Sequence, residues 1–204
     1  MYLVRPPYLL KKLYPGLLWR MGTDENKIFL SFDDGPHPEI TPWVLEELRK
    51  HDVKAIFFCV GENVKRYPKV YEQILAEGHL TGNHTFNHLN GWNSDSVKYL
   101  KNIAACAREV KSDFFRPPYG RMKKSQSARL RQLYKVVMWD VLSGDFDRAT
   151  RPEKCLENTL RYSRQGSVVV FHDSRKAWTN LSYVLPRYLD EMKKRGFSFG
   201  CLGS

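Results

Sequence analysis

The chain of 204 residues contains no uninterrupted apolar run of the length that a membrane span requires. A transmembrane helix needs about 20 consecutive apolar residues, whereas Arg5, Lys11, Pro15 and Gly16 interrupt the apolar residues near the N-terminus. No small-residue cleavage site follows them, so a standard secretory signal is not expected either. These absences predict a protein of the cytoplasm or one that is peripheral to the membrane.

Cysteine is also scarce, with four residues that form no C-x-x-C pair: Cys59, Cys106, Cys155 and Cys201. This spacing suggests neither a zinc ribbon nor a redox motif. A chain of this length buries a sizeable core without disulfides, and reduced thiols suit the cytosol. No linker or internal repeat divides the sequence, which favours one main domain.

Acidic residues are fewer than basic ones, with 22 Asp and Glu against 33 Lys and Arg and a net charge of +11. The excess favours an anionic surface or substrate. The positive charges are dispersed and no nucleic-acid module is recognisable, so no nucleic-acid partner is expected. Residues 9–19 are both basic and apolar. We expect the lead-in, residues 1–26, to pack as a strap on the domain, and peripheral membrane contact is the alternative.

Strand-like apolar runs alternate with segments of helical periodicity along the whole remainder of the chain. Strands are expected at residues 27–32, 55–60, 79–83, 114–115, 135–139, 167–171 and 197–199. Helices are expected at residues 38–51, 68–77, 95–111, 125–133, 153–163 and 181–194. This alternation predicts an α/β domain over residues 27–204 with a mainly parallel sheet, either open or closed into a barrel.

Polar side chains follow five of these strands, at the edge where functional residues of parallel sheets gather. They are Asp33 and Asp34, His84 and His88, Arg116 and Tyr119, Asp140 and Asp145, and His172 with Asp173. Each group alone has an ordinary explanation, such as two solvated acids in a turn or a chance pair of surface histidines. Their common position after strands predicts a single site.

The spacing of His84 and His88 places two imidazoles on one side of a helical turn, where they would share a metal. One carboxylate from Asp33 and Asp34 completes three protein ligands and leaves open positions, as in catalytic sites. The second carboxylate would then take a proton from water, and Arg116 would hold that acid ionised.

His172 is the candidate proton donor to a leaving group, provided that an acid keeps it charged. Asp140, Asp145 and Asp173 are the three acids that the sequence offers for this purpose. A core histidine at a strand end is the alternative.

Taken together, five motifs in order resemble those of the polysaccharide deacetylases of the NodB-homology type, carbohydrate esterase family 4. They are SFDDG at 31–35, HTFNH at 84–88, RPPYG at 116–120, a partial match at 139–146, and Val170-Phe171-His172. The resemblance implies an irregular (β/α)7 barrel of the NodB type. It also implies hydrolysis of the acetyl group of an N-acetylated, less often O-acetylated, sugar with release of acetate.

The resemblance implies a role for each matching residue. Asp33 would be the general base, and Asp34, His84 and His88 would hold a divalent metal, usually zinc or a similar ion such as cobalt. Arg116 would orient Asp33, and the backbone N–H of Tyr119 would stabilise the oxyanion together with the metal. His172 would be the general acid, tuned by Asp145.

The sequence departs from the family pattern around the expected acetyl pocket. Phe146 and Val170 stand where the family usually has Trp and Leu, and both keep the pocket apolar, so we expect that acetyl still fits. The upstream acid of the fourth motif is replaced by Leu142, which leaves Asp140 as a substitute for Asp145.

Two alternatives use the same scaffold. One is a metal-dependent amidohydrolase that acts on a non-sugar amide, and the other is a non-catalytic member that binds glycan. Without a signal or a sugar-binding module, the expected substrate is a small or lipid-linked sugar met inside the cell, and the basic lead-in would suit a substrate at a membrane face. The sequence indicates no protein partner.

Overall fold

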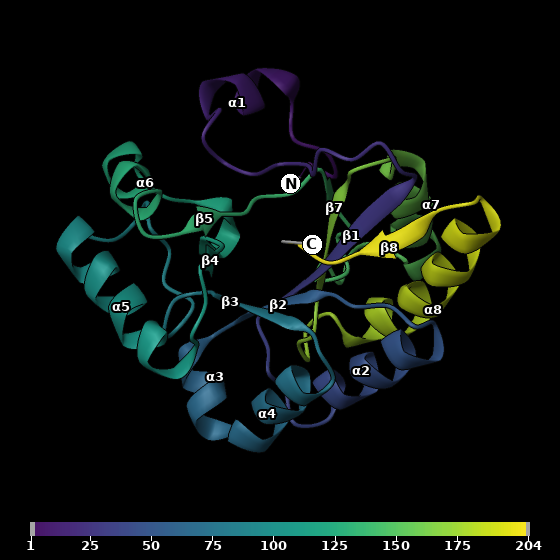
Figure 1. Cartoon of the computed structure of the whole chain (residues 1–204), viewed down its shortest axis with the longest axis horizontal. Helices are drawn as coiled ribbons and strands as arrows, with labels where there is room; N and C mark the ends of the chain where they lie inside the picture. Colours follow the sequence, from purple (N-terminus) through teal and green to yellow (C-terminus); the bar gives the residue numbers. More distant parts are fainter. Residues whose placement is uncertain (1–2, 203–204) are drawn as a thin grey trace.

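A single curled parallel sheet organises the computed structural model, which describes residues 3–202 (Figure 1). Its strands are β1 (Lys27–Asp33), β2 (Ile56–Cys59), β3 (Leu80–Asn83), β4 (Phe114–Phe115), β5 (Lys135–Val136), β6 (Val141–Leu142), β7 (Val168–His172) and β8 (Ser198–Gly200). The strand order is β5-β4-β3-β2-β1-β7-β6, and β8 pairs with the first half of β1. The predicted irregular barrel in one α/β domain is therefore confirmed.

Helices surround the sheet as an outer ring (Figure 1). They are α1 (Tyr8–Leu13), α2 (Ile40–Lys50), α3 (Gly61–Arg66), α4 (Pro68–Ala76), α5 (Ser96–Glu109), α6 (Lys124–Leu130), α7 (Pro152–Tyr162) and α8 (Trp178–Lys194), with a 3-10 turn, η1 (Pro118–Gly120). Pro186 lies inside α8 without ending it. Within residues 3–202, no helix has both the length and the apolar character of a membrane span.

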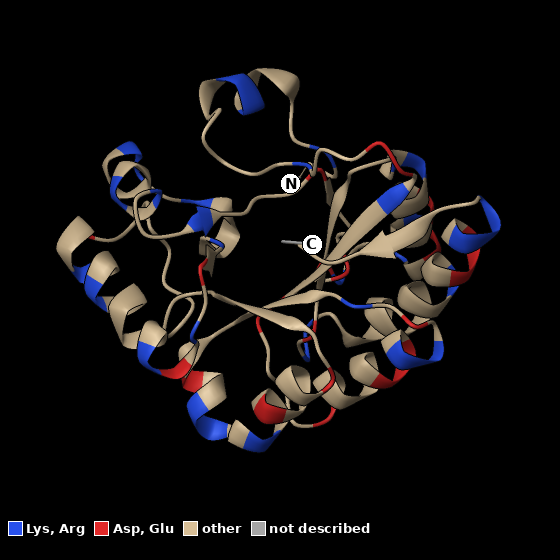
Figure 2. Cartoon of the chain, in the orientation of Figure 1, with Lys and Arg blue, Asp and Glu red and all other residues tan. Residues whose placement is uncertain are grey.

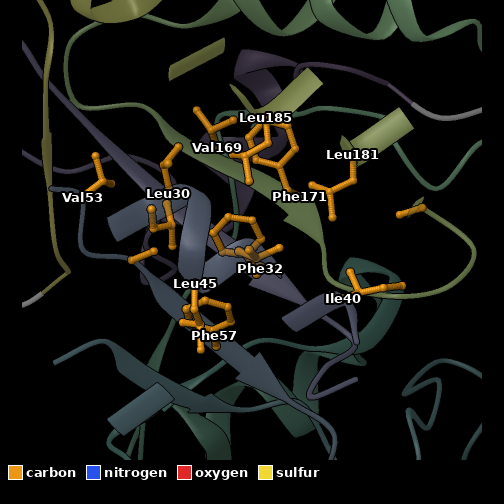
Figure 3. Close-up of a cluster of buried hydrophobic side chains, with 14 of the residues drawn as sticks. Leu30, Phe32, Ile40, Leu45, Val53, Phe57, Val169, Phe171, Leu181 and Leu185 are labelled. Atoms are coloured by element: carbon orange, nitrogen blue, oxygen red, sulfur yellow. The ribbon is translucent and has the colours of Figure 1, made fainter. Parts of the chain in front are cut away.

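The central strand β1 is buried on both faces, and its side chains alternate between two environments. Leu30 and Phe32 pack with Phe57 and Phe171 in the core between sheet and helices, as Figure 3 shows. The Phe32 and Phe57 rings stack with centroids 5.0 Å apart. The opposite face of β1 carries Phe29, Ser31 and Asp33, and the last two bring polar groups to the inside of the barrel.

The lead-in crosses the gap between β5 and the residues that precede β7. The Leu18 N–H donates to the Val136 carbonyl at 2.9 Å, and the Met138 N–H donates to the Leu18 carbonyl at 2.7 Å. On the other side, the Met21 N–H donates to the Gly166 carbonyl at 2.8 Å. Residues 17–21 thus supply backbone pairing to both edges of the gap. The first two residues of the predicted lead-in (1–26) and the last two of the predicted domain (27–204) lie outside the described residues.

A buried carboxylate, Asp140, fixes the lead-in to the sheet. Three of the four cations around it belong to the lead-in. Its partners are Lys11 Nζ, Arg5 Nε at 3.7 Å, Arg20 Nε at 3.6 Å, Arg164 Nε at 3.2 Å and Ser167 Oγ at 2.9 Å. The Asp140 side chain is wholly inaccessible to solvent. Its charge therefore holds together four cations that would otherwise repel one another.

We expect Asp140→Ala to lower the free energy of unfolding by about 3 kcal/mol, because it leaves partly buried cations without their counter-charge. Chemical denaturation of the two proteins measures the change. The exposed Asp24→Ala variant is the control, and its unfolding free energy should stay within about 0.5 kcal/mol of the parent. Equal midpoints for Asp140→Ala and Asp24→Ala would contradict the assignment.

Candidate active site

The carboxyl ends of β1, β3, β4 and β7 bring the predicted site residues together. The register of the parallel pairs explains this, because Asp33 lies opposite His172 and Asn83 lies opposite Phe115. His84 and Arg116 directly follow these last two residues. Side chains that are far apart in sequence therefore share one rim of the barrel.

Asp33 is held by a fully buried arginine. Arg116 Nη1 donates to Asp33 Oδ1 at 2.7 Å and to Ser31 Oγ at 2.8 Å. Nε and Nη2 donate to the Val137 and Met138 carbonyls at 3.2 and 2.9 Å. All three guanidinium nitrogens are thus hydrogen-bonded, which fixes one oxygen of Asp33. The other oxygen, Oδ2, lies on the side of the histidines, 4.0 Å from His84 Nε2.

Asp34, His84 and His88 form a compact group of potential metal ligands, whose ligand atoms all lie within 4.8 Å of one another. Asp34 Oδ1 is 3.1 Å from His88 Nε2 and 3.8 Å from His84 Nε2. This oxygen is buried, and no donor among the described residues is aligned for a hydrogen bond to it. A buried anionic oxygen facing two imidazoles without a hydrogen bond fits a divalent cation.

The protonation of these groups also suits a metal. His84 Nδ1 lies 2.8 Å from the Arg116 carbonyl, which only accepts, so Nδ1 carries the proton and Nε2 presents its lone pair. Burial lowers the pKa of His84 to about 4 and keeps the imidazole neutral. Burial alone would raise the pKa of Asp34, but His88, His172 and His84 outweigh it and hold the pKa below its usual range.

Backbone geometry, rather than a helical turn, aims these ligands. Asp34 has a φ of 81°, which interrupts the alternation of β1 and lets both neighbouring carboxylates reach the rim. Thr85 and His88 have φ values of 64° and 56°, so the predicted helical turn at residues 84–88 is wrong. Such left-handed residues cost about 1–3 kcal/mol each and persist where the surroundings enforce them.

His172 is paired with Asp145. Its Nδ1 lies 2.7 Å from Asp145 Oδ1, and its backbone N–H donates to Asp145 Oδ2 at 2.8 Å. Burial alone would lower the pKa of His172, but the charge and hydrogen bond of Asp145 outweigh it and raise the pKa to about 9. The imidazole is therefore a cation at neutral pH, with Nε2–H free to donate.

The two other acids considered for His172 lie elsewhere. Asp140 pairs with cations of the lead-in and not with His172, so its expected role as a substitute for Asp145 is wrong. Asp173 accepts hydrogen bonds from the Gly35 N–H at 3.1 Å and from the Thr41 hydroxyl, and burial raises its pKa to about 7. Asp173 thus fixes the turn that follows Asp34.

Three further residues border the candidate centre. The Tyr119 ring contacts the His88 ring at 4.6 Å between centroids, and the Phe146 ring contacts the His172 ring at 5.0 Å. Val170 is fully buried two residues before His172 in β7, and strand alternation puts both on the same face. Apolar groups therefore flank the polar centre.

The site also uses residues that sequence reasoning passed over. Ser31 receives an Arg116 N–H, and the Asn63 amide donates to the Asp34 carbonyl at 2.8 Å. Strand alternation would have placed Ser31 beside Asp33. Asn63 and Thr41 carried no signal, because their role depends on how α3 and α2 pack against the rim.

Three comparisons with known proteins agree with this geometry. The family model described as polysaccharide deacetylase matches residues 20–137. A peptidoglycan-N-acetylglucosamine deacetylase of Bacillus cereus is 33% identical over 94% of this chain and 94% of its own length. A chitooligosaccharide deacetylase of Azorhizobium caulinodans is 33% identical over 76% of this chain and 77% of its own length.

Among solved structures, a peptidoglycan N-acetylglucosamine deacetylase with a bound naphthalenyl N-oxidanyl-benzamide superposes with a TM-score of 0.86. It is 29% identical, and the alignment covers 97% of this chain and 95% of that one. The match spans the strands that position the acids and histidines as well as the family motifs. The chain therefore belongs to the polysaccharide deacetylase family.

Proposed function

We propose that this deacetylase hydrolyses the N-acetyl group of N-acetylglucosamine units in a glycan and releases acetate. The observation that carries the proposal is the convergence of the Asp34, His84 and His88 ligand atoms within 4.8 Å, beside the clamped Asp33. The names of the similar deacetylases of peptidoglycan and chitooligosaccharides support the choice of sugar.

Asp34, His84 and His88 would hold a divalent metal ion, and we propose zinc because two imidazoles and one carboxylate with open positions suit it. When bound, zinc supplies a Lewis acid that polarises the acetyl carbonyl and acidifies water. The benzamide bound in the solved relative carries a hydroxamic acid, a group that chelates such ions, which supports a metal at the equivalent place.

Asp33 is proposed to take the proton of the attacking water through Oδ2, since Arg116 occupies Oδ1. The water oxygen forms a bond to the acetyl carbon, and the backbone N–H of Tyr119 is proposed to donate to the carbonyl oxygen as negative charge develops there. Phe146 and Val170 are proposed to enclose the acetyl methyl group. Their apolar surfaces keep that side of the carbonyl free of water.

His172 is proposed to protonate the sugar nitrogen as the carbon–nitrogen bond breaks. Without that proton the amine is a poor leaving group, and an imidazolium held by Asp145 supplies it from Nε2. Acetate and the free amino sugar are the products, and the proton that Asp33 took from water replaces the one that His172 gave.

Asp145→Asn should move the basic limb of the kcat/KM profile to lower pH. In the parent, the acid form of His172 exists below a pKa of about 9 and is lost as the pH rises through that value. Removing the carboxylate charge leaves burial as the main influence, which lowers the pKa. We expect at least a roughly tenfold loss near neutral pH, because general acid catalysis contributes about 10²–10⁴-fold.

The pH profile of acetate release measures this effect. Asp190→Asn is the matched control, because the Asp190 side chain is 62% exposed and lies beside His51, at the end of α2. A basic limb that stays in place in Asp145→Asn would show that His172 is not the acid that limits activity at high pH.

The proposed reaction is tested with the zinc-loaded protein on a panel of substrates. Mass spectrometry should show loss of acetyl groups from chitooligosaccharides or peptidoglycan fragments, with one acetate released for each free amine formed. Reaction only on O-acetylated xylan or on a simple non-sugar amide would overturn the proposed substrate. Binding of the glycans without any acetate would indicate a non-catalytic member instead.

A further inference from the structure

The short helix α1 projects its apolar side chains away from the domain. It lies in the outer ring between α6 and α7 (Figure 1), yet none of its residues is buried. Tyr8, Leu9 and Leu13 are 72, 67 and 61% exposed. Of eleven exposed large hydrophobic residues in the described chain, five fall within residues 3–13, so the exposure is concentrated rather than scattered.

The orientation of α1 is fixed from the inside. Lys11 turns toward the domain and pairs with the buried Asp140. Leu9 and Leu13 are four residues apart and share one side of the helix, as do Tyr8 and Lys12, whose Nζ lies 4.9 Å from the Tyr8 ring centroid. The apolar side chains are therefore held in solvent by an ion pair on the opposite side of the helix.

The neighbouring surface of α6 carries positive charge. The end of α1 and α6 line one shallow pocket, which includes Leu13, Gly16, Lys124 and Arg131. Residues 3–23 and 114–139 contain no Asp or Glu. Figure 2 shows basic and no acidic residues on both helices. We call this surface the α1–α6 face, made of Tyr8, Leu9, Lys12, Leu13, Lys124 and Arg131.

We propose that the α1–α6 face docks on a membrane surface that contains anionic phospholipids. Exposed leucines and a tyrosine enter the boundary between headgroups and acyl chains, while Lys12, Lys124 and Arg131 meet the anionic headgroups. A second copy of the chain fits less well, because two such faces would bring positive charge against positive charge. The proposal does not rest on the proposed deacetylation.

Co-sedimentation with lipid vesicles tests this docking. The full chain should bind vesicles of phosphatidylcholine mixed with phosphatidylglycerol, bind vesicles of pure phosphatidylcholine far more weakly, and lose most of its binding at high salt. The double variant Leu9→Ser with Leu13→Ser should bind about tenfold or more weakly. Serine lacks the favourable free energy that leucine gains when its side chain leaves water for the membrane. Lys12→Gln should weaken the binding about fivefold.

The matched control is Leu75→Ser, an exposed leucine (47%) in α4, outside the α1–α6 face, which should bind like the parent. Unchanged melting temperatures and unchanged activity on a soluble substrate would show that the variants are folded. Equal binding to neutral and anionic vesicles, no binding to either, or full binding by the double leucine variant would overturn the proposal. Binding of an anionic glycan but not of anionic vesicles would overturn it as well.

Discussion

Asp33→Asn should reduce kcat by about three orders of magnitude and leave the metal in place. The amide keeps an oxygen that accepts the Arg116 hydrogen bond, so the geometry is retained. It has no carboxylate oxygen to take a proton from water, and a general base contributes about 10²–10⁴-fold to the rate. Steady-state acetate release gives kcat, and elemental analysis gives the zinc content.

Asp113→Asn is the matched control, because Asp113 is exposed just before β4. It should match the parent in both measurements. Near-normal turnover by Asp33→Asn would rule out Asp33 as the base. Loss of zinc together with activity would instead make Asp33 a ligand, and the separate roles of the two neighbouring acids would have to be abandoned.

Asp34→Ala and His88→Ala should lose metal and activity together. Each removes one of three atoms that face one another without hydrogen bonds, and the remaining two ligands do not hold a divalent ion firmly. Removing a residue that only hydrogen-bonds to a metal ligand lowers metal affinity by up to about a hundredfold. Removing a ligand itself should therefore lower the zinc affinity by more than that. Competition with a chromophoric chelator measures the affinity.

Chelation of the parent provides the internal comparison. The chelated protein should be inactive and recover on addition of zinc, whereas the two variants should not recover at the same zinc concentration. His51→Ala, at the C-terminal end of α2, serves as the histidine control and should bind zinc like the parent. Full activity of the chelated parent would exclude a metal-dependent reaction at this site.

Much of the architecture was predictable because each main strand is an apolar run bounded by turn residues. The alternation of strands with helical segments predicted an α/β domain with a parallel sheet, and the polar residues after strands predicted the common rim. The choice of a barrel over an open sheet came from the family resemblance. The missed strand β6 has only Val141 and Leu142, too short to show a period, and its existence depends on pairing with β7. Tertiary pairing, not local pattern, creates it.

Site geometry was less predictable where the backbone leaves its usual regions. The spacing of the histidines alone predicted a helical turn at residues 84–88. Thr85 and His88 instead adopt positive φ values, which their side chains do not predict. The sequence also could not show whether Asp140 or Asp145 is the partner of His172, because tertiary contacts decide it. Cations of the lead-in, more than a hundred residues away in the sequence, surround Asp140, and the motif around Asp140 does not include them.

The pairing of residues 17–21 across the gap has a consequence for the solubility of shortened chains. A chain that begins at Lys27 retains every motif of the family but exposes the backbone groups of Val136, Met138 and Gly166 that the lead-in now occupies. Unpaired strand edges of this kind recruit strands from other molecules. The region that carries the family motifs is therefore smaller than the unit that resists aggregation. The edge of β5 is protected by residues of the lead-in, which have no catalytic role.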